Sequence, residues 1–529
     1  MQTHYRNLRE FLHALETHEM LVRYSAPINK DTQLQPLVRL QFRGLPEAQR
    51  KGFLFERVAG AGGREYGMPV AACCMAASRA MYALGLGCAP REIGARWAHA
   101  LAKPVPPELV ARGPVQDVVY TGPALEAAGG LDMLPIPLAT PGFDNAPYTS
   151  ASYWITKDPE SGIRNVGTYR GQLKSPLRLG CYPASQQKGI AIHWRKARAR
   201  GVPLEAAVVL GAPPHVAYPA VAFLARDVDE LAVAGGFAGE PVPLVRCQTV
   251  DLEVPAEAEI VIEGRIPTDC LEEEGPFGEF TGFMARREFT YYLEVTAITH
   301  HRDPIYNLFL SQFPPSESSK IRQVAMENTI RRFLSVECGF AGVRDVAVHE
   351  SGGSQNFTVI QVSRAEGADP RAVLEAMARP DARSGKIVIT VDEDVDPHDA
   401  DSVVWAMAWR VQPHRDLETR PVPPHEMDYS VMPPAESVGT AAGQQASMLL
   451  VDATRKWPYP PQSLPAREYM DDALRLWEAA GLPDLRLREP WYGRPEGVWT
   501  AADREEAARA ARGDYYATGE RMARERRPT

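Results

Sequence analysis

The sequence predicts an α+β chain of several domains: an N-terminal α/β domain, a β-rich, barrel-like middle domain, and a C-terminal α/β domain that ends in a helical tail. Three observations predict this class. The 529 residues suffice for about two to four domains, each with its own core. The hydrophobic pattern changes from mixed to strand-like and back to mixed along the chain. A stretch rich in proline and glycine, residues 103–150, indicates a change of domain near residue 125.

The N-terminal part predicts a helix and then strands. Apolar residues recur at helical spacing across residues 5–23, which predicts an amphipathic helix. The runs FLFERV and MPVAACC predict two strands, and the turn-rich AGAGGREYG between them predicts a hairpin loop. The run SRAMYALGL then predicts a helix that stops at Gly87.

From residue 150 to about residue 312, β-branched and aromatic residues predict strands, most clearly in TSASYWIT, AVVLGA, VDLEVPAEAEIVIEG and FTYYLEVTAITH. The run SSKIRQVAMENTIRRFLSVE predicts a linking helix. A second α/β pattern follows in GVRDVAVHE, FTVIQV, DPRAVLEAMAR and GKIVITVDEDVDPHDADSVVWAMAWRV. The final TAADREEAARAARGDYYATGERMARERR predicts a charged helical tail that packs on a neighbouring element or another subunit.

The composition excludes several classes of protein. Hydrophobic residues make up 45% and charged residues 24%, and no run approaches the roughly 20 apolar residues of a membrane span. The first residues lack the order of a secretory signal, so we expect a cytoplasmic protein. A net charge of −9 argues against nucleic acid as a partner but permits a local basic pocket for a carboxylate or phosphate. Seven scattered cysteines without a CxxC pair favour reduced thiols over disulfides or structural zinc.

Common catalytic signatures are absent, including GxxxxGK[ST], GxSxG and HExxH. The run EGPFGE is more informative, because Glu274 and Glu279 lie five positions apart, which suits neither a helix face nor one face of a strand. Pro276 and two glycines predict a shaped loop. If the loop brings the carboxylates together, one tends to keep its proton near neutral pH, while an arginine between them keeps the other ionised.

Two further segments offer polar residues. In NVGTYRGQLKS, Arg170 is either a surface ion-pair partner or a catalytic group, and Asn165 precedes it. In ARDVDELAVAGGFAGEP, Glu230 is either a carboxylate on a helix face or a metal ligand. An Asn and a Glu suit Mg²⁺ or Mn²⁺ together with a ligand phosphate. The residues alone therefore predict a site for an acidic substrate, with a phosphate-bearing cofactor. A glycosidase is the alternative for two carboxylates, but nothing indicates an aromatic-lined sugar cleft.

Taken together, NVGTYR, LGAPP, VRCQTVDLEVPAEAEIVIEG, EGPFGEFTGF and IVITVDEDVDP, in this order, resemble the UbiD family of decarboxylases, which use prenylated FMN. The resemblance begins at NLREFLHALETHEMLVRYSAPINKD and covers most of the chain. It implies a middle split β-barrel of the flavin-reductase type that holds the cofactor, and a homo-oligomer, either a dimer or a hexamer. The expected division is an N-terminal α/β domain (1–124), a split β-barrel prenyl-FMN-binding domain (125–312), a linking helix (313–334), a C-terminal α/β oligomerisation domain (335–490) and a helical tail (491–529).

The resemblance also implies catalytic roles. The Glu-Arg-Glu set of the family falls on Arg170, Glu274 and Glu279. Arg170 is expected to pair with Glu274 and to help hold the substrate carboxylate, while Glu279 delivers the proton that replaces CO₂. Loss of CO₂ from an sp² carbon leaves a high-energy carbanion, so the modified flavin is expected to act as an electron sink. Glu272 and Glu273 are then expected to be surface charges.

The family binds its flavin phosphate through a divalent cation, usually Mn²⁺, held by an Asn, a His and a Glu, with K⁺ or another monovalent cation nearby. Where the His is expected, this chain reads YPASQQKGIAIHW. A glutamine carbonyl also ligates Mn²⁺ or Mg²⁺, so Gln186 or Gln187 is preferred here to His193, which stays an alternative. The expected metal ligands are Asn165, Gln186 and Glu230, and the expected cofactor contacts are Asn165, Thr168, Arg170, Gln187 and Glu230.

The expected function is the non-oxidative, reversible decarboxylation of a small aromatic or α,β-unsaturated carboxylic acid, with prenylated FMN supplied by a flavin prenyltransferase. One alternative is an enzyme that acts on a CoA-linked or otherwise activated aromatic acid, or that works as a carboxylase. A second alternative is a non-catalytic flavin-binding subunit, which the change at the His position would fit.

Overall fold

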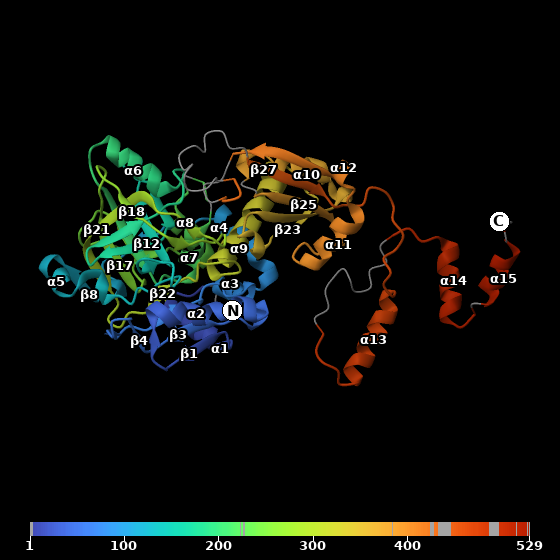
Figure 1. Cartoon of the computed structure of the whole chain (residues 1–529), viewed down its shortest axis with the longest axis horizontal. Coiled ribbons are helices and arrows are strands. Elements are labelled where there is room, and N and C mark those ends of the chain that lie inside the picture. The colour runs from blue at the N-terminus through green and yellow to red at the C-terminus, as the bar shows by residue number, and fades with distance from the viewer. Residues whose placement is uncertain are drawn as a thin grey trace.

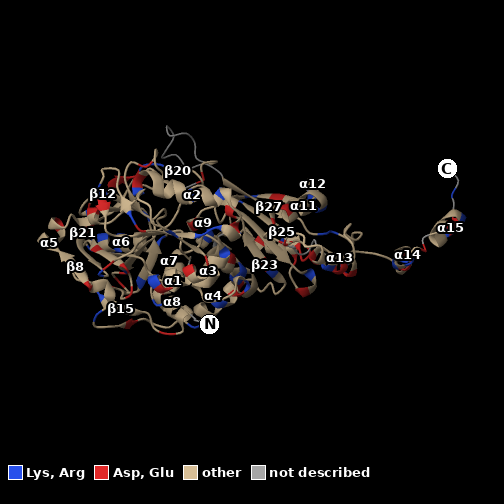
Figure 2. Cartoon of the chain, turned by 90° about the horizontal axis from the view of Figure 1, so that it is seen from below, with Lys and Arg blue, Asp and Glu red and all other residues tan. Residues whose placement is uncertain are grey.

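The computed structural model describes residues 4–222, 224–225, 228–382, 385–423, 428–431, 446–485, 497–514, 516–525 and 527. The chain is a mixed α/β protein with several sheets (Figure 1). The N-terminal elements lie beside a large central sheet, and a second sheet near the C-terminus lies on the far side of helix α9 (Figure 1). Basic and acidic residues are interspersed over the elements drawn in Figure 2.

Helix α1 (Leu8–Thr17) confirms the first part of the predicted helix. Asn7 caps it by accepting a hydrogen bond from the backbone N of Glu10, and the apolar side chains that predicted it are buried. The expectation of helix up to residue 23 is wrong, because the chain turns at Glu19 (φ 56°) and continues as strand β1 (Leu21–Tyr24). Strand β1 pairs in parallel with β3, so its residues form a strand where the last turns of the predicted helix were expected.

The N-terminal sheet has the order β1-β3-β6-β22. Strands β3 and β6 confirm the two predicted strands, and the short antiparallel pair β4 and β5 confirms the hairpin between them. Helix α3, capped by Ser78, confirms the next prediction. The elements are β2 (Ile28–Asn29), α2 (Gln35–Gly44), β3 (Gly52–Phe55), β4 (Val58–Ala59), β5 (Glu65–Tyr66), β6 (Val70–Ala72), α3 (Arg79–Gly85), α4 (Ile93–Ala102) and β22 (Tyr306–Leu308).

The described part of the middle region contains a ten-stranded sheet in which the paired strands run antiparallel. It confirms the strands predicted between residues 150 and 312. Its strands, in the order in which they pair, are β11 (Arg164–Thr168), β10 (Ser152–Lys157), β14 (Leu204–Leu210), β17 (Ile260–Ile266), β21 (Glu288–His300), β13 (Arg178–Cys181), β12 (Gly171–Ser175) and β9 (Tyr148–Thr149), with β8 (Val118–Thr121) and β18 (Glu272–Glu274) also paired to β21.

Shorter elements surround this sheet. A three-stranded sheet has the order β16-β15-β7, and helix α6 covers one end of β10 and β11. These elements are β7 (Glu108–Leu109), α5 (Gly122–Ala127), α6 (Gly189–Ala199), α7 (Pro214–Val221), α8 (Glu230–Ala238), β15 (Pro243–Arg246), β16 (Glu253–Pro255), β19 (Phe277–Gly278) and β20 (Met284–Ala285). Strand β8 pairs with a strand of the central sheet, and strand β22 pairs with a strand of the N-terminal sheet. The domain limits and the barrel remain predictions.

Helix α9 (Glu317–Arg332) confirms the predicted linking helix and leads into the C-terminal sheet, whose order is β23-β24-β25-β27-β26. Strands β24, β25 and β27 run parallel to one another. Helices α9 and α10 pack on one face of this sheet, and α11 packs on the other. The elements are β23 (Val343–Val348), β24 (Phe357–Val362), α10 (Pro370–Met377), β25 (Ile387–Asp392), α11 (Ala400–Arg410), α12 (Pro413–Asp416), β26 (Leu417–Val422) and β27 (Ala446–Asp452).

The tail is helical, as predicted, in α14 (Ala501–Ala511) and α15 (Tyr516–Arg524), which follow α13 (Arg467–Ala479). None of the residues described in these three helices is buried, and Figures 1 and 2 both show them away from the body. The expected start of the tail at residue 491 lies outside the described residues. What the tail packs on remains a prediction. Among the described helices, none is long and apolar enough to cross a membrane.

Candidate functional site

The segment that holds Glu274 and Glu279 is a bend between two short strands. Strand β18 ends at Glu274 and pairs with β21, and strand β19 begins at Phe277 and pairs with β20. Between them Gly275 adopts φ 102°, and a Cβ atom there would lie 2.7 Å from the backbone O of Arg286. The sequence predicts this bend at the right place. The residues on either side of it belong to paired strands, so strand pairing fixes their positions.

Arg170 joins the two carboxylates. Its Nε and Nη2 donate to Oε1 and Oε2 of Glu274 at 2.9 Å and 2.6 Å, and its Nη1 donates to Oε1 of Glu279. The exposed fractions are 7% for Arg170, 1% for Glu274 and 9% for Glu279. The three residues that the sequence predicts to act together therefore lie in one buried cluster, with the guanidinium between two acids.

Aromatic rings and low exposure set the electrostatics of this cluster. The guanidinium carbon of Arg170 lies 4.0 Å from the ring centroid of Tyr182 and 5.2 Å from that of Phe277. Burial raises the pKa of Glu279, and Arg170 offsets part of that rise. Burial alone would lower the pKa of Arg170, but Glu279 and Glu274 outweigh it and raise that pKa. The arrangement is a fixed cation beside an acid that tends to keep its proton.

The expected surface charges lie at the edge of the cluster. Glu272 forms ion pairs with Arg178 at 2.6 Å and with Lys174 at 3.4 Å. Glu273 is exposed and lies 3.6 Å from Arg287. Both carboxylates are thus paired with cations other than Arg170.

Sequence reasoning missed Arg322, a residue of helix α9 whose positive charge lowers the pKa of Glu279. Its Nη2 donates to Oε1 of Gln355 at 2.8 Å, and its guanidinium carbon lies 3.9 Å from the ring centroid of Phe280. Burial lowers the pKa of Arg322 to about 10, and Glu279 counters part of this shift. The sequence shows only that Arg322 is a basic residue in the run predicted as the linking helix.

Two more residues near the cluster were missed. The hydroxyl of Tyr148 donates to the backbone O of Pro276 at 3.2 Å, and its ring lies 4.6 Å from that of Phe277. Burial raises the pKa of Asp144 to about 6, while Arg170 counters this rise. Both belong to the stretch that the sequence marks only as rich in proline and glycine.

Asn165 and Glu230 come together at a second place. Oε2 of Glu230, at the start of α8, accepts a hydrogen bond from the backbone N of Val166 at 2.8 Å. Burial raises the pKa of Glu230 to about 8. Asn165 lies so close to helix α6 that a Cβ atom on Gly189 would come within 1.9 Å of Asn165 Oδ1. The close approach of α6 at a glycine leaves room for the Asn165 amide, and Glu230 is hydrogen-bonded to the residue that follows Asn165.

The three candidates for a third ligand lie differently. Gln186 is exposed, and its Oε1 accepts from Arg195 at 3.0 Å and Tyr291 at 3.3 Å. Gln187 is exposed and donates through its backbone N to Ser185. His193 is buried, and its Nδ1 lies 2.8 Å from Oγ1 of Thr156, the residue paired with Asn165 across β10 and β11.

The electrostatics favour a neutral imidazole at this place, because burial lowers the pKa of His193 to about 4. The structure thus brings His193 into contact with Thr156 of β10, the residue opposite Asn165. Thr168, at the end of β11, donates to the backbone O of Ala220 at 3.3 Å. Within the described part of the chain, no three His, Cys, Asp or Glu side chains form a metal-binding group.

Comparison with known proteins gives a consistent result. The family model of the 3-octaprenyl-4-hydroxybenzoate carboxy-lyase Rift-related domain matches residues 108–312, and that of the C-terminal domain of the same carboxy-lyase matches residues 321–453. An uncharacterized protein of Synechocystis sp. is 29% identical over 92% of this chain and 98% of its own length. An uncharacterized protein of Archaeoglobus fulgidus is 32% identical over 66% of this chain and 69% of its own.

Solved structures of similar fold are enzymes. The UbiD-class enzyme HmfF from Pelotomaculum thermopropionicum, in an evolved dimeric form in complex with prFMN, is 29% identical with a TM-score of 0.75, over 88% of this chain and 98% of that one. The vanillic acid decarboxylase of Sedimentibacter hydroxybenzoicus, in closed form, is 27% identical with a TM-score of 0.75, over 90% of this chain and 99% of that one. These proteins and this chain share their fold over most of their lengths.

Proposed function

Because this chain belongs to the UbiD family of carboxy-lyases, we propose that it catalyses the reversible, non-oxidative decarboxylation of a small aromatic or α,β-unsaturated carboxylic acid with prenylated FMN. The single observation that carries this proposal is the buried cluster of Arg170 with Glu274 and Glu279. A surface ion pair contributes little and needs no burial, whereas this cluster buries three ionisable groups together at a cost in solvation. Such a cost is typical of a catalytic site.

Each residue of the cluster has a distinct task. Glu274 is held by two hydrogen bonds from Arg170 and so fixes the plane of the guanidinium. Arg170 then presents a positive charge to the substrate carboxylate. Glu279 keeps a proton because burial raises its pKa, and it donates that proton from a carboxyl oxygen to the carbon that has lost CO₂. In the reverse direction, Glu279 takes the proton back.

Prenylated FMN, when bound, supplies the electron sink that accepts the negative charge left as CO₂ departs. The residues at the Asn165 site fit such a group, since an amide, a carboxylate and a nearby neutral imidazole are ligands for a divalent cation that also binds phosphate. We propose that Asn165 and Glu230 hold Mn²⁺ or Mg²⁺ against the flavin phosphate, with K⁺ or another monovalent cation nearby. Thr168 and Gln187 are proposed as further cofactor contacts.

The third metal ligand is proposed among Gln186, Gln187 and His193. The contacts favour His193, because the Gln186 carbonyl oxygen is already bonded to Arg195 and Tyr291. A His193→Ala variant that loses bound Mn²⁺, beside a Gln186→Ala variant that keeps it, supports this choice. The reverse pattern in elemental analysis of the two purified variants contradicts it.

The proposal is tested by producing the protein together with a flavin prenyltransferase and measuring CO₂ release from a panel of aryl and acrylic acids. The panel includes a CoA thioester of an aromatic acid that carries a free carboxylate on its ring. Turnover of this compound without turnover of the free acids indicates an enzyme that acts on CoA-linked acids. Absorbance confirms bound flavin before each assay. Turnover of one panel member supports the proposal, and no turnover of any acid by flavin-loaded protein supports a non-catalytic flavin-binding subunit instead.

A further inference from the structure

The C-terminal sheet has a crevice at the carboxyl ends of its parallel strands. Strand β24 continues into α10, which packs on one face of the sheet, whereas β25 continues into α11, which packs on the other. The two connections therefore diverge at the edge where β24 and β25 end. In open α/β sheets, ligands bind where such connections diverge, outside the carboxyl ends of the strands.

Two adjoining cavities occupy this edge. The first, of about 360 Å³, is lined by residues that follow β24, β25 and β27, and Trp457 and Tyr459 form one wall. The ring centroids of these two aromatic residues lie 6.1 Å apart, and the backbone N of Val498 donates to the backbone O of Tyr459 at 2.8 Å. The second cavity, of about 480 Å³, shares Arg364, Arg455 and Trp457 with the first.

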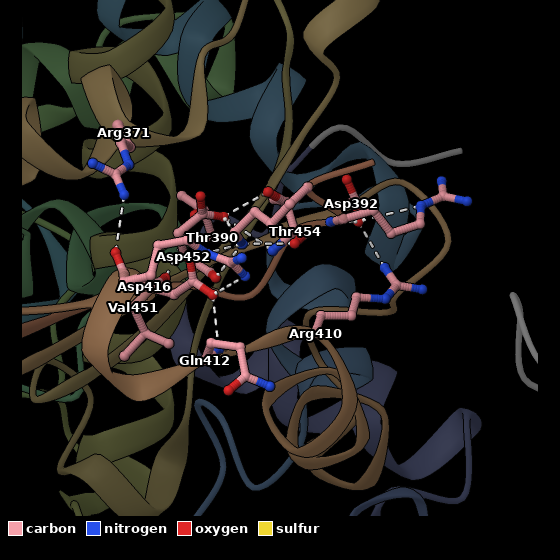
Figure 3. Close-up of polar contacts among 12 residues, drawn as sticks. Arg371, Thr390, Asp392, Arg410, Gln412, Asp416, Val451, Asp452 and Thr454 are labelled. Atoms are coloured by element: carbon pink, nitrogen blue, oxygen red, sulfur yellow. Dashed lines mark hydrogen bonds and ion pairs between the residues drawn. The ribbon is translucent and has the colours of Figure 1, made fainter. Parts of the chain in front are cut away.

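The second cavity is cationic. Five Lys or Arg side chains line it against three Asp side chains, and Asp392 of the adjoining cavity pairs with Arg455 at 3.5 Å, which leaves a surplus of one positive charge. Two of the acids, Asp416 and Asp452, are buried at its base and are already bonded. Asp452 accepts from Thr454 and Lys456, as the contacts around Asp452 and Thr454 in Figure 3 show. The acids therefore hold the cations in place without neutralising all of them.

Asp416 shows how firmly this base is built. Arg415 donates to both of its oxygens at 2.8 Å. The backbone N of Gln412 donates to Asp416 at 2.7 Å (Figure 3). Burial would raise the pKa of Asp416, but these hydrogen bonds and Lys456 outweigh burial and lower it to about 2. Arg371, which also lines the second cavity, donates to the backbone O of Arg415 at 2.9 Å. Arg371 is therefore linked through Arg415 to Asp416.

We propose that this crevice binds a mononucleotide. The phosphate is held in the cationic cavity by charge-assisted hydrogen bonds from Arg364 and Arg371. Lys456 adds its positive charge nearby, while its own hydrogen bonds go to Asp452 and Thr454. The base lies in the adjoining cavity against Trp457 and Tyr459, because every base has a face that stacks on an aromatic ring. Asp392 and Glu393, at the end of β25, line the same cavity and accept hydrogen bonds from ring amino groups.

Isothermal titration of the full chain with AMP tests the proposal, with adenosine and inorganic phosphate as probes for each half of the ligand. AMP is expected to bind more tightly than either probe. Trp457→Ala should weaken AMP binding by about tenfold and leave phosphate binding unchanged, and Arg371→Gln should weaken both AMP and phosphate binding by about tenfold. CMP and GMP in further titrations show how selective the base cavity is.

The matched control is Arg420→Gln, which removes an exposed arginine of β26 that pairs with Glu418 outside both cavities. This variant is expected to bind AMP as the unchanged protein does. Melting temperatures of all variants show whether each is folded, and ligand-observed NMR of the unchanged chain gives contacts of the AMP ring protons independently of any variant. No binding of AMP at millimolar concentration, or equal affinity in Trp457→Ala, Arg371→Gln and the control, overturns the proposal. The titrations need no flavin, so their outcome is independent of the carboxy-lyase activity.

Discussion

Replacing Arg170 by Met removes the cation between two buried carboxylates and keeps a side chain of similar length. Glu274 is 1% exposed and Glu279 9% exposed, so neither acid gains water when the guanidinium is lost. Removal of one partner from a buried ion pair typically costs about 3–5 kcal/mol, because the other charge stays buried without compensation. For a domain of the size that holds this cluster, that loss corresponds to a fall in melting temperature of roughly 6–20 °C.

The sign of the pH dependence follows from the same two acids. In the variant, an ionised Glu279 has no arginine partner in the cluster, and a larger fraction of its carboxyl groups is protonated at low pH than at high pH. Burial already raises the pKa of Glu279 in the folded protein, and the variant lacks the arginine that opposes this rise. A carboxyl whose folded pKa lies above its unfolded value costs stability as pH rises, so the deficit of the variant should grow between about pH 5 and pH 8.

Scanning calorimetry of flavin-free protein at both pH values measures this effect. Arg178→Met is the matched control, since Arg178 pairs with Glu272 at 2.6 Å but its side chain is 47% exposed. An exposed pair contributes about 0–1 kcal/mol, so the control should melt within roughly 4 °C of the unchanged protein at both pH values. Adding Glu274→Gln to Arg170→Met should recover part of the loss at pH 8. Equal shifts for Arg170→Met and the control, or a loss that does not depend on pH, would refute the reasoning.

Three further predictions follow from the two site regions. The decarboxylation rate should fall as pH rises through the raised pKa of Glu279, because the donor must carry a proton. A stopped-flow pH profile measures this rate, and a rate that rises over that range contradicts the role of Glu279. Arg322→Met removes a second cation near Glu279 and should move that fall toward higher pH by up to about one unit, whereas an unchanged profile means that Arg322 does not act on Glu279. Gly189→Ala places a Cβ within 1.9 Å of Asn165 Oδ1 and should lower retained flavin in purified protein, while Gly44→Ala, with no atom within 4 Å of the added Cβ, should retain as much flavin as the unchanged chain.

The sequence predicted the parts of the fold that depend on local pattern. The apolar spacing in Leu8–Thr17 and the β-branched runs of the central sheet are local signals, and the corresponding elements are confirmed. The error at residues 18–23 has a non-local cause, since β1 exists because it pairs with β3, about thirty residues further along the chain. Pairing partners of this kind are not visible in a window of one helix length.

The same distinction applies to the site. The bend at Gly275 was predictable, because proline and glycine restrict or permit backbone angles by themselves. The place of Arg170 between Glu274 and Glu279 followed only from a resemblance, since Arg170 and β18 are far apart in sequence. Arg322 and the contact of His193 with Thr156 went unnoticed, because both depend on how helices α9 and α6 pack on other elements.

The most direct test of the account is deuterium incorporation at the decarboxylated carbon in D₂O, measured by mass spectrometry for flavin-loaded protein and its Glu279→Gln variant. Glutamine preserves the shape of the side chain but carries no acidic proton, and loss of a general acid typically costs about 10²–10⁴ in rate. The account predicts one deuterium per product with the unchanged protein, and a loss of this order in the variant with flavin still bound. Full activity of Glu279→Gln with flavin bound would contradict the assignment of Glu279 as the proton donor.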